Sequence, residues 1–262
     1  MSELFGYLAS AFVGITMGLL GGGGSILTIP ILVYLFSVSP TLAISYSLFI
    51  VGVTSLVGTV NNFRRGTVDT RTALLFGSAS VTTVFLTRKF IIPNLPDIFF
   101  TIGSYSVTHS MFVMVMFAIL MVAASLSMIR NRKPSVDPKN AGKPQVLLAY
   151  GILIGLVTGF LGAGGGFLLI PALVLLMRLP MKRAIGTSLF IISFNSLIGF
   201  TGDLGRHPIE WKLVLTITAI AMVGIFIGGY FNTRIPSRKL KIAFGWFVLL
   251  TGIYIIIRET AG

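Results

Sequence analysis

The chain has 262 residues, of which 55% are hydrophobic and 10% charged, with a formal net charge of +13 and no cysteine. Soluble proteins carry about 25% charged residues, so this composition excludes a soluble globular protein and predicts membrane-spanning helices. The absence of cysteine excludes disulfide, iron–sulfur and thiolate chemistry. Because the basic residues lie in short loops, the net charge indicates membrane topology and not a nucleic-acid partner.

The first half of the chain predicts a series of apolar helices. They cover about residues 4–20, 25–36, 42–60, 70–90 and 106–129. The N-terminus has no basic region before its apolar run, so we expect it to begin the first helix and not to be a cleaved signal. Two prolines predict extended or turning chain over residues 91–97. A polar linker at 130–145 ends this half.

The second half repeats this plan, with helices expected at about residues 146–161, 166–177, 183–201, 210–231 and 238–258. At a constant offset of 141 residues, the sequence GLLGGGGSILTIP of 18–30 recurs as GFLGAGGGFLLIP, with eight of thirteen positions identical. At the same offset, residues 43–58 match 184–199 at nine of sixteen positions. Two blocks that share one offset indicate gene duplication.

The distribution of Lys and Arg over the loops predicts how the repeats are oriented. If each glycine-rich segment reverses the chain, fifteen of the twenty basic residues fall on one side of the membrane; if each is only a kink, eleven do. Basic residues concentrate in cytoplasmic loops. We therefore expect an all-α polytopic membrane protein with two inverted-topology repeats of about five segments, at 1–129 and 146–262. The linker at 130–145 is expected in the cytoplasm and both termini outside it, and whether the broken helices span or re-enter is left open.

The paired glycine-rich segments form the candidate substrate site. Each glycine in a helix costs about 1 kcal/mol relative to alanine, and backbone opened inside a membrane persists only where protein or a wet cavity surrounds it. Matching breaks in two halves point to a transporter's binding site, and amides at a helix start favour an anion. The alternative is that the glycines let helices cross closely. The candidate residues are Gly22, Gly23, Gly24, Ser25, Gly164, Gly165 and Gly166.

Uncharged polar residues on the second helix of each repeat are further candidates, because such donors suit an oxyanion that must bind and then leave. They are Ser47, Thr54, Ser188 and Asn195. Thr54 and Asn195 occupy equivalent positions in the two repeats. The alternative for the hydroxyls is hydrogen bonding between helices, which contributes about 0.6 kcal/mol on average.

Few ionisable residues lie at apolar depth. Asp203 is a candidate proton carrier or a loop residue at the membrane interface, and the two histidines, His109 and His207, are interpreted as interfacial. Two distant histidines without cysteine provide no metal site. No Lys-Ser/Thr pair follows the glycines, which excludes a P-loop, and no strand precedes them, which excludes a dinucleotide fold. We therefore expect no cofactor.

The glycine-rich blocks, each followed by Ala-x-x-x-Ser-Leu-Phe, resemble the sulfite exporter TauE/SafE family, the 4-toluene sulfonate uptake permease group. The resemblance covers nearly the whole chain. It implies a membrane transporter of small sulfur-containing anions such as sulfite, sulfoacetate or other organosulfonates. The motif residues carried over are 21–25 with Pro30 and 162–166 with Pro171. Residues 99–109 have no match in the second half.

The sequence thus predicts a transporter that moves a small anion by alternating access around a midplane site, in the cell inner membrane. The expected partners are that anion and the lipid bilayer, without nucleic acid; a homo-oligomer is left open. One alternative is an anion channel. Another is an intramembrane serine hydrolase in which Ser25 and His109 form a dyad; the duplication argues against it, because Ser25 corresponds to Gly166.

Overall fold

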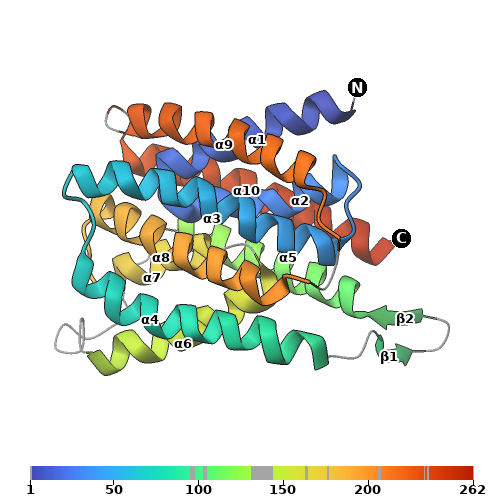
Figure 1. The fold of residues 1–262 in the computed structure, drawn as a ribbon. Helices are drawn as coiled ribbons and strands as arrows, with labels where there is room; N and C mark the ends of the chain where they lie inside the picture. Colours follow the sequence, from blue (N-terminus) through green and yellow to red (C-terminus); the bar gives the residue numbers. More distant parts are fainter. Residues whose placement is uncertain are drawn as a thin grey trace.

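The computed structural model describes residues 2–94, 98–102, 105–130, 144–162, 165–175, 177–205, 208–232, 234 and 236–261. In these parts the chain forms a bundle of long helices with a short β-hairpin at one end (Figure 1). Six of the described helical segments are long and apolar enough to cross a membrane. The predicted helical, polytopic membrane fold is therefore confirmed.

The described residues of the N-terminal half form five α-helices. They are α1 (Ser2–Leu20), α2 (Thr28–Tyr34), α3 (Pro40–Arg64), α4 (Thr70–Leu86) and α5 (His109–Ile129). A 3₁₀ helix, η1 (Gly21–Leu27), joins α1 to α2. After α4 come a π-helical turn, η2 (Thr87–Ile91), a 3₁₀ turn, η3 (Ile92–Asn94), and the antiparallel strands β1 (Ile98–Ile102) and β2 (Tyr105–Thr108).

The region between α4 and α5 corrects two predictions. Residues 91–94 are helical and not extended, because Pro93 lies in the short η3, where the missing amide interrupts no long helix. Helix α5 begins at His109 and not near residue 106, because β2 continues to Thr108. The hairpin occupies the segment that has no match in the second half.

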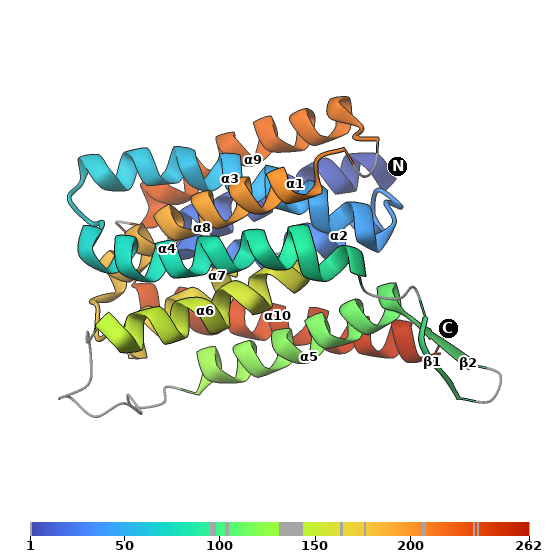
Figure 2. The same cartoon turned by 60° about the horizontal axis from the view of Figure 1, so that its bottom comes forward.

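The C-terminal half contains five further helices and no strand among its described residues. They are α6 (Pro144–Leu161), α7 (Gly166–Leu175), α8 (Met181–Asp203), α9 (Trp211–Asn232) and α10 (Ser237–Ala261). The helices then pair mainly across the halves: α1 with α9, α3 with α8, α4 with α6, and α5 with α10 (Figures 1 and 2). Since α6 corresponds to α1 and α4 to α9 in the repeat, the first and third pairs are equivalent.

The pair of α3 and α8 lies at the centre of the bundle, and the two helices are antiparallel. Ser45 near the start of α3 hydrogen-bonds to Asp203 at the end of α8, whereas Gly58 near the end of α3 packs beside Leu189 near the start of α8. These two segments are also the most buried of the six candidate spans, at 67% and 72%. These two equivalent helices therefore run in opposite directions.

The first glycine-rich segment reverses the chain. The rings of Tyr7 in α1 and Phe36 after α2 lie 5.2 Å apart, so the two arms enter and leave at the same end of the bundle. Helix α1 runs alongside α9 as far as Asn232, whose side chain donates to the carbonyl of Leu19. The return arm, by contrast, contains only the seven residues of α2 and the seven of η1. The first broken helix is thus a hairpin with one long arm and one short arm.

Candidate functional site

The two glycine-rich segments meet inside the bundle. A Cβ atom placed on Gly166 would overlap the carbonyl oxygen of Gly22, and one placed on Gly22 would lie 2.7 Å from the Cα of Gly166. Both residues are buried. Only residues without a side chain allow two backbones to approach this closely. The glycines of the repeat therefore bring η1 and the start of α7 into direct contact.

The first segment differs from the prediction of open backbone amides. Residues Gly21–Leu27, including the candidates Gly22, Gly23 and Gly24, form the 3₁₀ helix η1 and are buried. In such a helix each amide donates to the carbonyl three residues earlier. The Ser25 hydroxyl donates to the carbonyl of Gly22 at 2.7 Å. The amides of this segment are thus largely used within the helix.

The second segment leaves amides available at the start of α7. Gly165 has a φ of 66°, and its carbonyl accepts hydrogen bonds from Leu168 and Leu169. The first amides of an α-helix have no carbonyl partner within that helix. The first amide of α7 belongs to Gly166, which lies beside Gly22. The candidate Gly164 lies outside the described residues.

Two polar candidates of α8, Ser188 and Asn195, have neighbours on other elements. A Cβ atom on Gly21 would lie 2.9 Å from the Ser188 hydroxyl oxygen, and Gly22 packs against Ile192, one turn further along α8. Asn195 continues this face, and its Nδ2 donates to the Ser80 hydroxyl of α4 at 2.7 Å. The structure therefore joins Ser188 to the first glycine-rich segment, and Asn195 to α4.

Buried polar atoms without a hydrogen-bond partner are concentrated in this interior. Among the described residues, such oxygen atoms belong to Thr28, Ser47, Thr54, Ser55, Thr87, Thr158, Asn195 (Oδ1) and Ser196. An unsatisfied buried polar group costs about 1–3 kcal/mol, and native proteins contain few of them. Four of these residues lie on α3 and α8 in repeat-related pairs, Thr54 with Asn195 and Ser55 with Ser196. The interior thus holds donors and acceptors that are free to bind a polar guest.

Ser55 and Ser196 are absent from the candidates that the sequence singled out. Both are fully buried, and both are serine at equivalent positions of the duplicated block. Identity across the repeat was therefore a signal that could have identified them. Thr158, which packs against Gly165 at the second segment, has no such signal because methionine stands at the equivalent position 17.

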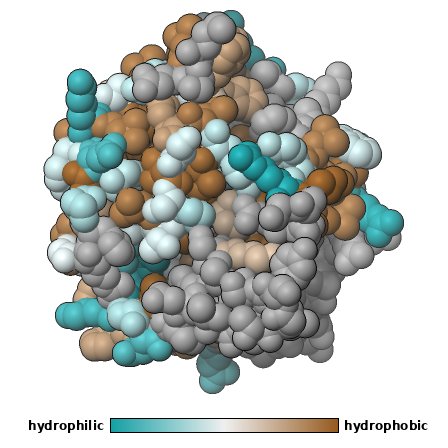
Figure 3. Space-filling model, turned by 90° about the vertical axis from the view of Figure 1, so that its right-hand side faces the viewer, coloured by the Kyte–Doolittle hydropathy of each residue, from teal (hydrophilic) through white to brown (hydrophobic). Residues whose placement is uncertain are grey.

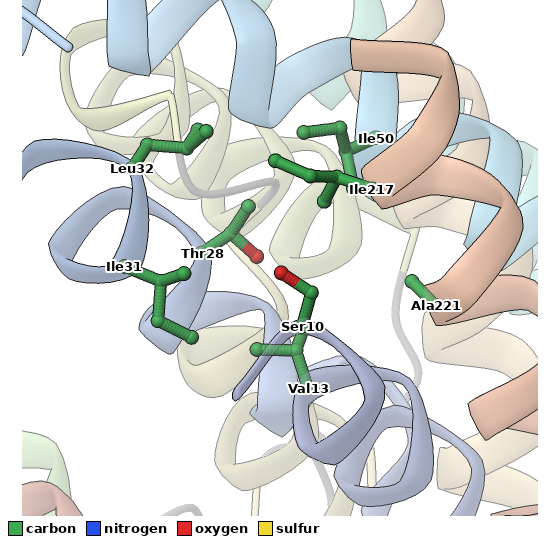
Figure 4. A pocket seen from close by; sticks show the side chains of 8 residues that line it. All are labelled: Ser10, Val13, Thr28, Ile31, Leu32, Ile50, Ile217 and Ala221. Carbon is green, nitrogen blue, oxygen red and sulfur yellow. The ribbon is translucent and has the colours of Figure 1, made fainter. Parts of the chain in front are cut away.

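A small cavity lies beside the first segment, between α1, α2, α3 and α9 (Figure 4). It is barely large enough for one water molecule. The hydroxyl groups of Ser10 and Thr28 point toward one another across it, while Ile50, Ile217 and Ala221 supply apolar walls. This space is too small for an oxyanion in the conformation described.

Asp203 is part of a buried charged cluster. Its Oδ2 atom lies 2.6 Å from Arg88 Nη2 and accepts a hydrogen bond from the Ser45 hydroxyl at 2.6 Å. The side chains of Arg88 and Asp203 are 4% and 7% exposed. The count of loop charges that predicted the topology included Arg88, but the structure places this residue in η2, inside the bundle. Proton transport by Asp203 stays a prediction.

The remaining ionisable candidates are the two histidines. His109 begins α5, and His207 lies outside the described residues. The described residues contain no group of three or more His, Cys, Asp or Glu that could hold a metal ion. A helical membrane bundle whose two broken segments meet at a buried polar centre has the architecture of a membrane transporter.

Comparison with known proteins identifies the family. Residues 7–255 match the family described as "Sulfite exporter TauE/SafE". The chain therefore belongs to this family, and it is a membrane transporter and not an enzyme. No solved structure matches the chain.

Relatives are found in bacteria and in a plant. A "Probable membrane transporter protein" of Xylella fastidiosa is 32% identical over 97% of this chain and 94% of its own length. The "Probable membrane transporter protein YunE" of Bacillus subtilis is 27% identical over 98% of both chains. "Sulfite exporter TauE/SafE family protein 3" of Arabidopsis thaliana is 28% identical over 44% of this chain and 24% of its own length.

Proposed function

We propose that this transporter moves a small sulfur-containing oxyanion, such as sulfite or an organosulfonate, by alternating access around the contact of Gly22 with Gly166. The observation that carries the proposal is the set of buried polar atoms on α3 and α8 that have no hydrogen-bond partner, together with the packing of α8 against Gly21 and Gly22. An oxyanion would accept hydrogen bonds from the hydroxyls of Ser47 and Thr54, from that of Ser188 once it leaves the carbonyl of Ile185, and from the first amides of α7. The family name provides the substrate class.

We infer that the two halves are inverted repeats, which would allow one site to face each side of the membrane in turn. The antiparallel packing of α3 against α8 supports this, because these helices occupy equivalent places in the duplicated sequence. The equivalent pairs α1–α9 and α4–α6 support it as well. In transporters built in this way, substrates bind near the midplane at the interface of the repeats.

The distribution of exposed basic residues supports a cytoplasmic location for one end of the bundle. Eight described residues are exposed at the end where α3 and α5 end and α4 and α8 begin: Arg64, Arg65, Arg71, Arg130, Arg178, Lys182, Arg183 and Arg234. Lys89, Lys212 and Arg258 are exposed at the other end. By the positive-inside rule, the first end faces the cytoplasm, and the start of α1 and the end of α10 face outward across the inner membrane.

A carrier is favoured over a channel by the contact between the two segments. The backbones of Gly22 and Gly166 touch, so an anion passes this point only after the helices move. A carrier that must move for each anion also exchanges anions across the membrane. We therefore expect trans-stimulation: unlabelled anion on the far side accelerates uptake of labelled anion.

The test is flux into proteoliposomes together with thermal stability of the purified protein. We expect sulfite or a sulfonate such as sulfoacetate to raise the melting temperature with dose, because a ligand of the folded state stabilises it by RT ln(1 + [L]/Kd). The same anion should be taken up and show trans-stimulation. Sulfate, thiosulfate, taurine and lactate are the comparison solutes. If no sulfur oxyanion stabilises the protein or crosses the membrane, the proposal is wrong.

A further inference from the structure

The cluster of Arg88, Asp203 and Ser45 closes one end of the central helices. Arg88 follows α4, Asp203 ends α8, and Ser45 lies near the start of α3, so the ion pair and the hydrogen bond tie three helices together. Arg88 lies six residues before the end of η3 at Asn94, about 9 Å of helix. The cluster is thus buried just inside the end of the bundle that Figure 3 shows from outside.

Aromatic side chains cover the neighbourhood of this cluster. Phe49 of α3 lies 5.2 Å from Phe200 of α8 and 5.6 Å from Trp211 of α9, measured between ring centroids. The Tyr46 hydroxyl accepts a hydrogen bond from the amide of Glu210 at 2.9 Å. Access to Arg88 from this end therefore requires the ends of α3, α8 and α9 to separate.

The positions at the opposite end that correspond to this cluster carry uncharged residues. At the offset of 141 residues, Ser45, Asp203 and Arg88 correspond to Gly186, Asn62 and Gly229. There the Asn62 side chain accepts from the Thr67 hydroxyl and donates to the carbonyl of Gly58. The residues equivalent to the cluster are thus all uncharged, so the charged cluster is a specific addition to one end and not a product of the duplication.

A purely structural role explains this pair poorly. Charged side chains inside a membrane are costly and mark functional sites. Replacing a buried ion pair with apolar residues is often neutral or stabilising. The guanidinium group binds carboxylates and other oxyanions in the same way, through two parallel N–H groups. A transported oxyanion and the Asp203 carboxylate are therefore competitors for Arg88.

We propose that Arg88 is an anion-binding residue at this end of the bundle. While this end is closed, the Asp203 carboxylate binds the Arg88 guanidinium in place of the anion. An arriving oxyanion displaces the carboxylate from the guanidinium, which releases the end of α8 from η2 and opens the path. When the anion leaves, Asp203 returns and this end closes. This proposal rests on the proposed function, because it names a second contact for the same transported anion.

The test compares uptake by proteoliposomes that contain variants of the pair. Asp203→Asn removes the competing charge and should lower the KM for the anion at this face at least about fivefold. Arg88→Gln should raise that KM about tenfold or more, the effect of losing a hydrogen bond to a charged group, and Arg88→Lys should raise it less. Arg65→Gln is the matched control. Arg65 is exposed at the other end, where it donates to the carbonyl of Gly229. We expect the KM of the Arg65→Gln variant for the anion to be unchanged.

The charge-swapped variant separates anion binding from structural support. Arg88→Asp with Asp203→Arg keeps an ion pair and should restore the melting temperature, but it moves the guanidinium to α8 and should leave the KM raised. If the swap restores both quantities to wild-type values, the pair is only structural. Should the Arg88→Gln variant fail to fold, the Asp203→Asn variant still tests the proposal, because an unchanged or higher KM of that variant for the anion contradicts it.

A second readout uses the absence of cysteine from the chain. Ser45→Cys introduces a single thiol beside Asp203. We expect the transported anion to accelerate its labelling by a membrane-impermeant thiol reagent, and Asp203→Asn to accelerate it without anion. If neither the anion nor the Asp203→Asn substitution changes the labelling rate, this proposal is contradicted and the proposed function still stands. If wild-type protein moves no anion, the proposed function fails first and this inference with it.

Discussion

At the scale of single residues, substitution of Asn195 distinguishes a role in transport from a role in stability. It is fully buried in α8, donates to Ser80, and keeps its Oδ1 without a partner among the described residues. Replacing both members of a buried polar pair with apolar groups can be nearly neutral for stability. We therefore expect Asn195→Leu combined with Ser80→Ala to change the melting temperature little and to abolish most anion uptake. Equal loss of stability and uptake would show that the pair is structural.

Gly166 provides a second residue-scale prediction, because its backbone touches that of Gly22. An alanine Cβ there would overlap the Gly22 carbonyl oxygen, which is backbone and cannot rotate away. We expect Gly166→Ala to lower the free energy of unfolding by about 1–3 kcal/mol, as overpacking does, and to reduce flux strongly. Gly77→Ala is the control, since its Cβ would meet only Ile191 at 3.6 Å. Normal anion flux by the Gly166→Ala variant would show that this contact is not part of the transport path.

At the scale of elements, the pairing of α1 with α9 depends on glycines in backbone contact. A Cβ atom on Gly228 would overlap the carbonyl oxygen of Ile15, whereas one on the neighbouring Gly229 would meet only the Asn61 side chain at 3.5 Å. We expect Gly228→Ala to separate the helices and lower the melting temperature, and Gly229→Ala to be tolerated. Thermal unfolding in detergent measures both. Similar melting temperatures for the two variants would contradict the close packing of α1 on α9.

The sequence predicted the elements better than their detailed geometry. Apolar runs and the shared offset located the helices, because hydrocarbon requires long helical spans. The 3₁₀ form of η1 was missed, since glycine content predicts a break but not which hydrogen bonds replace the α-helical ones. The burial of Arg88 was missed because a basic residue near the end of a span has the composition of a loop. The position of Asp203, at the end of another helix, gives Arg88 an interior partner.

At the scale of the whole molecule, the cluster at one end makes the bundle asymmetric despite its duplication. The two glycine-rich segments meet in the interior, and the buried ion pair of Arg88 with Asp203 lies at one end. Opening that end requires this charged contact to break, whereas the hydrogen bonds across the other end join Asp69 to Thr187 and Arg65 to the carbonyl of Gly229. The two faces should therefore differ in their affinity for the anion.

The orientation of the bundle can be tested because the chain contains no cysteine. Phe63 is 46% exposed at the end of α3, among the basic residues, and Leu204 is 50% exposed after α8, at the opposite end. In the orientation that we propose, the excess of Lys and Arg beside Phe63 marks the cytoplasmic end. In intact cells, an impermeant maleimide should thus label Leu204→Cys, and it should label Phe63→Cys only after the membrane is opened. The reverse pattern would invert the orientation, and labelling of both from outside would contradict the antiparallel packing of α3 and α8 across the bilayer.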